Sequence, residues 1–176
     1  MLLSRNDLVS TLFCETDRAQ RMKMPLALVK LEIVAREGGQ SEPGDAAFDT
    51  ALREIVGRIT PLLRCYDSVG QMADREYLLL LPGCSIVNAK RLAERLRDEV
   101  FGVSVAGCAE QMRFKACYAV ASSGGRSPLV VLRDVDRALQ RAKTECAGSI
   151  QTAGSNEETD PAAFIAPEPQ DEAFHT

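Results

Sequence analysis

The sequence predicts one α+β (α/β) domain in which helices pack around a mixed β-sheet that contains a β-hairpin. Two observations lead to this prediction. Segments with apolar residues at helical spacing alternate along the chain with segments in which apolar and polar residues alternate. Two of the strand-like segments are separated by only a few polar residues, as in a hairpin. A chain of 176 residues is long enough for one domain with a full hydrophobic core.

In the first half of the chain, a helix precedes a strand and a second helix. Residues 4–23 have apolar side chains at helical intervals, and Pro25 ends that segment. Residues 26–34, with the sequence LALVKLEIV, alternate in the manner of a strand that has one covered face. Asp45 can then cap a helix over residues 45–63.

In the second half, the pattern predicts a hairpin, a helix, further strands and a last helix. The four residues ADRE form the tip of the hairpin, and Pro82-Gly83 closes its second strand. The expected strands are residues 68–72, 77–81, 102–106 and 113–122, and the expected helices are residues 85–100 and 129–146.

This order of elements sets two strand-helix-strand units around a hairpin. It suggests a ferredoxin-like or nucleotide-cyclase-like mixed sheet with the helices on one face. From residue 148 onward the composition shifts to Gly, Ser, Pro, Ala and acidic residues, which are too poor in large apolar groups to offset the entropy of ordering. We therefore expect a domain over residues 1–147 and a disordered acidic tail over residues 148–176.

Composition and charge argue against several classes of protein. Six of the 25 acidic residues and no Lys or Arg lie beyond residue 150, so the domain itself is almost neutral and unsuited to tracking nucleic-acid phosphates. The six cysteines form no CxxC pair and the only histidine is His175, so no zinc or other metal cofactor is expected. No apolar run is long enough for export or for a membrane span. These features predict a soluble cytoplasmic protein with reduced thiols.

Several segments together resemble a known family. In order they are LLSR (residues 2–5), MPLALVKLEI (24–33), AFDTALREIVGRITPLLRCYD (47–67), YLLLLPG (77–83) and DVDRALQRAK (134–143). Their order and spacing are similar to the GGDEF domain of bacterial diguanylate cyclases, which condense two GTP molecules to cyclic di-GMP. The resemblance covers roughly residues 2–147 and implies a bacterial signalling domain with the nucleotide-cyclase-like fold.

The five residues that match the family's signature are nearly all changed. They are Ala73, Asp74, Arg75, Glu76 and Tyr77. In the family, two glycines let the hairpin approach the substrate phosphates, and here Ala73 and Asp74 add side chains at those positions. The family's third residue supplies a carboxylate for Mg²⁺, whereas Arg75 cannot coordinate a cation. We expect Glu76 to be a structural remnant and Tyr77 to belong to the core of a strand.

Other parts of the family's active site are also incomplete. Of its two metal-binding acids in the first strand, Glu32 could serve as one, but the second position is Val34. The resemblance places Asp45 at a guanine contact and Lys143 at the phosphate lysine. Phosphoryl transfer depends on bound metal ions, and one possible ligand cannot hold two of them well. The resemblance therefore implies a degenerate domain without catalytic residues.

A second site of the family is retained, in register. The family's inhibitory site binds cyclic di-GMP through an RxxD motif five residues before the signature, and here Arg64 and Asp67 stand at that spacing. The arginine positions of the following helix fall on Arg91 and Arg95. Arg64 can donate to O6 and N7 of guanine, Asp67 can accept from N1 and N2, and the other arginines suit phosphate. Tyr66 could stack on a base.

Other interpretations of the same residues stay open. The RxxD pattern also occurs at residues 95–98 and 133–136, and Arg91 and Arg95 could pair on an exposed helix face with Glu94, Asp98 and Glu99. The leading hypothesis is a cyclic di-GMP receptor, whose ligand in the family often bridges two domains. A nucleotide-independent scaffold for a protein partner is the second, and residual diguanylate cyclase activity with an altered metal site is the third.

Overall fold

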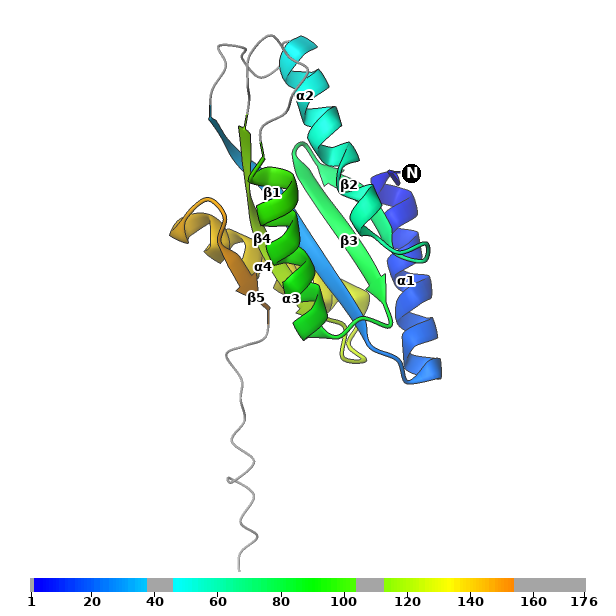
Figure 1. Ribbon diagram of the computed structural model, residues 1–176. Helices are drawn as coiled ribbons and strands as arrows, with labels where there is room; N and C mark the ends of the chain where they lie inside the picture. The colour runs from blue at the N-terminus through cyan, green and yellow to red at the C-terminus, as the bar shows by residue number, and fades with distance from the viewer. Residues whose placement is uncertain (1, 38–45, 104–112, 154–176) are drawn as a thin grey trace, which may run out of the picture.

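The computed structural model describes residues 2–37, 46–103 and 113–153, which form a five-stranded sheet covered by helices (Figure 1). The strand order is β2-β3-β1-β4-β5, and only β4 and β5 run parallel. The predicted mixed sheet is thereby confirmed. The strands are β1 (Leu26–Glu37), β2 (Ser68–Ala73), β3 (Glu76–Pro82), β4 (Arg113–Ser122) and β5 (Ile150–Thr152).

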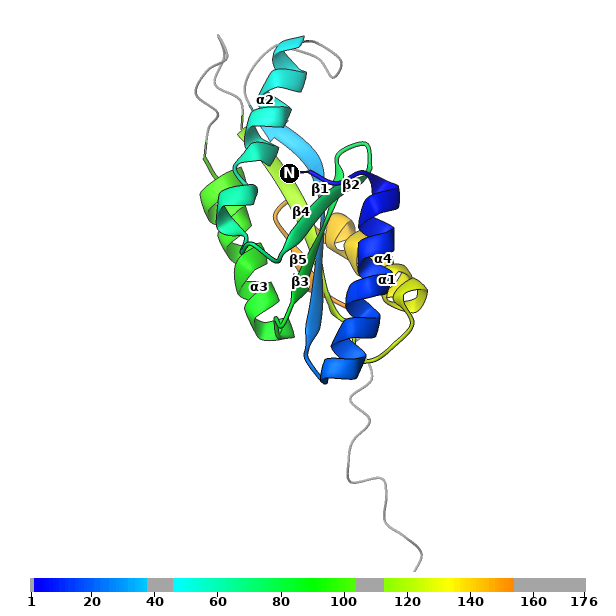
Figure 2. The ribbon, with the colours of Figure 1, turned by 90° about the vertical axis from the view of Figure 1, so that its right-hand side faces the viewer.

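Helices cover both faces of the sheet. Figure 2 shows α2 and α3 on one side and α1 and α4 on the other. They are α1 (Arg5–Met22), α2 (Ala46–Gly57) followed by the short helix η1 (Thr60–Leu62), α3 (Ile86–Arg95) continued by the π-helical turn η2 (Leu96–Phe101), and α4 (Pro128–Glu145). In the described parts of the chain, no helix combines the length and apolarity needed to cross a membrane.

The expectation that the helices share one face is wrong, because the central strands are apolar on both sides. In β1, Val29 and Leu31 face the core under α2 and α3, while Leu26 and Leu28 face the core under α1 and α4. All four side chains are fully buried. A sheet with two apolar faces needs a helical layer on each of them.

The start of the chain is fastened to the far edge of the sheet. Leu3 pairs with β2, since its N–H donates to the Val69 carbonyl at 2.9 Å and its carbonyl accepts from the Gln71 N–H at 3.2 Å. Ser4 then caps α1. Gly70 makes this approach possible, because a Cβ there would lie 2.8 Å from the Leu3 carbonyl oxygen.

The hairpin has a shorter tip than its sequence suggests. Ala73 and Glu76 are paired, so the turn consists of Asp74 and Arg75 rather than of four residues. Arg75 adopts a left-handed backbone conformation, with φ of 60°. Its carbonyl accepts a hydrogen bond of 3.0 Å from the N–H of Ile33 in β1, which attaches the tip to the sheet.

Two expectations for the end of the domain are also corrected. Residues 102–106 do not begin a strand at Gly102, because the π-helical turn continues to Phe101, whose ring packs edge-on against Tyr118. Residues 104–106 lie outside the described ranges. The folded domain also passes the expected boundary at residue 147, since β5 pairs with β4 and Ala153 is buried. Backbone pairing with β4 holds this short segment in place, although its sequence contains few large apolar residues.

Candidate functional site

The four residues predicted to bind a ligand surround one cavity. Arg64 and Asp67 come from the turn before β2, and Arg91 and Arg95 come from α3. The cavity has a volume of about 320 Å³. Three arginines and one aspartate therefore line the same hollow, and their formal charges sum to an excess of positive charge.

The turn from Arg64 to Asp67 is closed by its own hydrogen bonds. The Arg64 N–H donates to Oδ2 of Asp67 at 2.8 Å, and the Asp67 N–H donates to the Arg64 carbonyl at 3.1 Å. Asp67 is half-buried, while the side chain of Arg64 is exposed. An aspartate commonly stabilises a turn in this way, so Asp67 has a structural role beside any role in binding.

Helix α3 presents the other two arginines on its outer side. Ser85 caps the helix by accepting from the Asn88 N–H at 3.4 Å, and the buried residues Ala89 and Ala93 fix which side faces the sheet. Arg95 forms a 3.3 Å ion pair with Glu99, with both side chains about half exposed. Among the described residues, no ion pair involves Arg91. One pairing considered from the sequence is thus present, and one arginine remains available.

Sequence reasoning missed several residues of this cavity. Asn88 lines it one helical turn before Arg91, and this i, i+3 spacing on one helix face was the signal that could have revealed it. Leu62, Leu81 and Leu92 supply an apolar floor. Burial raises the pKa of the Cys84 thiol above its usual value, although the nearby Arg64 opposes that shift. The thiol at the cavity wall therefore stays protonated at neutral pH.

The residues at the hairpin tip are partly open to solvent. The side chain of Asp74 is 88% exposed, and its Oδ2 lies 3.8 Å from Nε of Arg75. Ala73 is exposed at the end of β2. At the tip, therefore, Asp74 projects into solvent, whereas Arg75 is half-buried.

Glu76 is occupied by a lysine of the neighbouring strand. Nζ of Lys30 lies 2.7 Å from Oε2 of Glu76 and 2.6 Å from Oδ1 of Asp136 in α4. Lys30 is only 7% exposed. Burial by itself lowers the pKa of Lys30, but the hydrogen bonds with Asp136 and Glu76 outweigh it, so the pKa lies above its usual value.

Glu32 also pairs with a lysine, and this lysine is Lys143, which was predicted to contact phosphate. Nζ of Lys143 lies 2.8 Å from both carboxylate oxygens of Glu32. Glu32 stands directly opposite Glu76 in the β1–β3 register, where two unpaired carboxylates would repel each other. Val34 packs against the core under α1 and α4. Nowhere in the described ranges do three His, Cys, Asp or Glu side chains gather to hold a metal ion.

Of the remaining predicted residues, Tyr77 lies in the core and Asp45 lies outside the described residues. Tyr77 is 4% exposed, as expected for a strand-core residue, and burial raises the pKa of its phenol. It also borders a cavity of about 540 Å³ beside α2. Asp45 lies outside the described residues. From α2, Asp49 lines this cavity, although its sequence pattern gave no sign of such a role.

The two groups of residues lie on opposite faces of the sheet. Lys30 and Glu76 belong to the face covered by α4, whereas the cavity of the three arginines lies at α3 and is floored by Leu81. Along β3, Glu76 and Pro82 are six residues apart, which corresponds to roughly 20 Å. Changes at one site can therefore leave the geometry of the other intact.

Solved structures share this fold. The GGDEF domain of TpbB (YfiN) from Pseudomonas aeruginosa has 23% identity and a TM-score of 0.75, covering 86% of this chain and 90% of that one. SiaD from Pseudomonas aeruginosa, solved with its activator SiaC, has 26% identity and a TM-score of 0.73, covering 86% and 59%. The GGDEF domain of DgcB from Caulobacter crescentus, solved with cyclic di-GMP, has 18% identity and a TM-score of 0.71, covering 88% and 90%.

Curated relatives and a family comparison agree. Diguanylate cyclase DgcP from Pseudomonas aeruginosa is 29% identical over 130 residues, which are 73% of this chain and 19% of that protein. The probable diguanylate cyclase DgcE from Escherichia coli is 31% identical over 74 residues, or 42% and 7%. The chain thus spans about a fifth or less of their lengths. Residues 1–148 match the family described as "Diguanylate cyclase, GGDEF domain", and the chain therefore belongs to the GGDEF domain family.

Proposed function

We propose that this chain is a GGDEF domain that has lost diguanylate cyclase activity and acts as a receptor for cyclic di-GMP. The ligand binds in the cavity bordered by Arg64, Asp67, Arg91 and Arg95. The observation that carries the proposal is that these four residues, from two separate elements, line one hollow of about 320 Å³.

The charges at the positions of the family's active site support the proposed loss of catalysis. A cyclase needs carboxylates that are free to bind metal ions, and metal ions that neutralise charge on the transferred phosphoryl group. Here Glu32 and Glu76 are held by lysine ammonium groups at 2.8 and 2.7 Å. At the tip, Arg75 occupies the position of the metal-binding acid. A divalent cation would have to displace two ion pairs and approach an arginine.

The chemistry of the arginine cavity suits a guanine dinucleotide. The exposed guanidinium of Arg64 can donate two parallel hydrogen bonds to O6 and N7 of guanine. Asp67 uses Oδ2 in its turn, and its other oxygen can accept from the N1 and N2 hydrogens. Arg91 and Arg95 lie one helical turn apart on the other wall and can hold the phosphates between them.

Isothermal titration calorimetry with cyclic di-GMP tests the receptor. We expect saturable binding to the wild type and at least a tenfold loss of affinity, roughly 1.4 kcal/mol, in Arg64→Ala, because both guanine hydrogen bonds disappear. Arg21→Ala is the matched control, since Arg21 is exposed, pairs only with Asp17 among the described residues, and lies outside the cavity. No heat with the wild type, or equal affinities in wild type and Arg64→Ala, would reject the receptor.

The absence of cyclase activity is tested separately. The purified chain is incubated with GTP and either Mg²⁺ or Mn²⁺, and the products are separated by chromatography. We expect no cyclic di-GMP above a reaction without protein, because Lys143 and Lys30 compete with metal ions for the carboxylates of Glu32 and Glu76. Accumulation of product in proportion to protein concentration would show that the chain is still an enzyme.

A protein partner is the second candidate. SiaD, which shares the fold at 26% identity, has been solved together with an activator protein. For this chain, a scaffold role predicts a stable complex with a partner or a homodimer whose formation is indifferent to cyclic di-GMP. The receptor role predicts instead that association, if it occurs, increases when the dinucleotide is added.

A further inference from the structure

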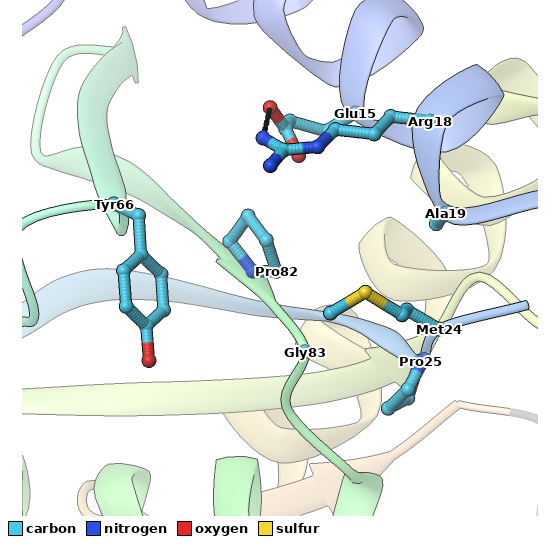
Figure 3. Close-up of a pocket in the computed structure, with 8 residues that line it drawn as sticks. All are labelled: Glu15, Arg18, Ala19, Met24, Pro25, Tyr66, Pro82 and Gly83. Atoms are coloured by element: carbon cyan, nitrogen blue, oxygen red, sulfur yellow. Dashed lines mark hydrogen bonds and ion pairs between the residues drawn. The ribbon is translucent and has the colours of Figure 1, made fainter. Parts of the chain in front are cut away.

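A second cavity lies on the α1 side of the end of the sheet where β3 ends, near the arginine cavity on the α3 side, and Tyr66 is part of its wall. The second cavity has a volume of about 390 Å³ and is bordered by Tyr66, by Met24 and Pro25 before β1, and by Pro82 and Gly83 after β3. The arginine cavity is bordered by the residues on either side of the same segments, including Arg64, Leu81 and Cys84. In Figure 3 the ring of Tyr66 stands across the cavity from Met24 and Pro25, with Pro82 between them.

Tyr66 is a large aromatic residue with half of its surface, 51%, exposed on a turn. Its hydroxyl contacts Arg64, because Nη1 of Arg64 donates to the tyrosine hydroxyl at 3.0 Å. Cζ of Arg64 also lies 5.9 Å from the centre of the ring, within the range of a cation–π contact. The same arginine therefore borders one cavity and steadies the wall of the other.

The walls of the second cavity fit a flat apolar group. Pro82, Pro25, Met24 and Ala19 are uncharged, and Tyr66 adds an aromatic face. The charged residues at its rim, Glu15 and Arg18, are already paired with each other at 3.5 Å. A nucleobase stacked on an aromatic side chain is held mainly through its π-face, so such a site tolerates either purine.

We propose that the second cavity is a half-site for the second base of the ligand, which stacks on the ring of Tyr66. This inference rests on the proposed function, in which Arg64 and Asp67 read the first base. The domain then requires a cyclic dinucleotide rather than a single nucleotide. It demands guanine at one base and accepts any purine at the other.

Calorimetric titrations with three cyclic dinucleotides test the half-site. For the wild type we expect cyclic GMP-AMP to bind within about threefold of cyclic di-GMP, because adenine stacks as guanine does. Cyclic di-AMP is expected to bind at least about tenfold more weakly, because adenine cannot satisfy Arg64 and Asp67. Equally weak binding of cyclic GMP-AMP and cyclic di-AMP would overturn the half-site, because the second base would then be recognised by hydrogen bonds.

Variants at Tyr66 isolate the contribution of the ring. Tyr66→Ala is expected to lower the affinity for cyclic di-GMP and for cyclic GMP-AMP by about tenfold each. The affinities of Tyr66→Phe should stay within about threefold of those of the wild type. Phe13→Ala is the matched control, because Phe13 is 45% exposed and borders neither cavity. If Tyr66→Phe loses as much affinity as Tyr66→Ala, the hydroxyl and not the ring is responsible, and the half-site is wrong.

Failure of this inference differs from failure of the receptor itself. A wild type that binds no cyclic di-GMP overturns both. Binding that is lost in Arg64→Ala but unchanged in Tyr66→Ala leaves the receptor standing and removes the half-site. Because Tyr66 is half exposed, the variants are expected to unfold at the wild-type temperature, which circular dichroism checks for each of them.

Discussion

Among the single residues, Lys30 balances the most negative charge on the face of the sheet under α4. It lies between Glu76 and Asp136, with ammonium-to-oxygen distances of 2.7 and 2.6 Å. A buried lysine is stable only when its charge is fully compensated, and a strand position among leucines would otherwise favour an apolar residue. The ammonium thus supplies the positive charge that a carboxylate cluster requires.

Replacement of this lysine tests that view. Lys30→Met keeps the length of the side chain but leaves Glu76 and Asp136 without their cation, so we expect the free energy of unfolding at neutral pH to fall by about 2 kcal/mol. Urea denaturation measures the difference. Lys90→Met on the exposed side of α3 serves as the control and should stay within about 0.5 kcal/mol of the wild type. Equal stabilities for the wild type and Lys30→Met would show that the cluster contributes nothing.

The difference in unfolding free energy between the wild type and Lys30→Met should depend on pH with a definite sign. The pKa of Lys30 is raised in the folded protein above the 10.5 of an ordinary lysine. Its contribution is therefore complete below pH 10.5 and is lost as the pH rises through the folded-state pKa. The gap between wild type and Lys30→Met should stay level from about pH 8 to 10 and shrink above that. A gap that widens in alkali would contradict the assignment.

At the scale of elements, β5 shows how a short strand can depend on its neighbour. The Tyr118 N–H donates to the Ser149 carbonyl at 2.9 Å, the Gly148 N–H to the Ala116 carbonyl at 3.0 Å, and the Ala153 N–H to the Val120 carbonyl at 2.8 Å. The segment therefore completes the outer edge of β4, and Ile150 adds its side chain to the core under α3.

Truncation measures what this edge strand contributes. We expect the free energy of unfolding to be about 2 kcal/mol lower for a chain that ends after residue 147 than for one that ends after residue 153. The shorter chain loses these hydrogen bonds and the packing of Ile150. The 153-residue chain is the control, since it retains β5. Identical urea midpoints for the two truncated chains would show that the end of the domain lies where its composition changes, at residue 148.

Local patterns in the sequence predict the elements that have strong periodicity. The alternation in LALVKLEIV and the short polar spacer before YLLLL identified β1 and the hairpin. The one-sided apolar stripes identified the helices, because such a stripe reflects packing. Three features are decided only by tertiary contacts: β5 pairs because β4 has a free edge, Phe101 remains helical because it packs on Tyr118, and two apolar faces call for two helical layers.

In the candidate sites too, local sequence patterns do not predict contacts that depend on tertiary packing. The arginines Arg64, Arg91 and Arg95 could be placed together from the resemblance and from helical spacing. Their association with Asn88 and the neighbouring cavity at Tyr66 depends on how the turn before β2 packs against α3 and the start of β1. The pairing of Lys30 with Glu76 was also hidden, because it joins residues 46 positions apart that meet only in the sheet.

In the whole molecule, the sheet separates two groups of charged residues. One face, under α1 and α4, holds carboxylates that are neutralised by lysines, and the other face, under α3, borders the cavity with excess positive charge. Figure 2 shows these helical layers on opposite sides of the strands. Because the two sites share only the strands between them, substitutions could remove the chemistry of one while the other kept its shape.

Chemical-shift mapping tests this separation most directly. Cyclic di-GMP is titrated into the ¹⁵N-labelled chain, and the backbone amide shifts are followed by NMR. We expect the largest changes at Arg64–Asp67 and along α3 from Asn88 to Arg95, while the amide shifts of Ala73–Glu76 and Lys143 stay unchanged. Changes centred on the hairpin tip and Lys143, or no changes at all, would contradict it.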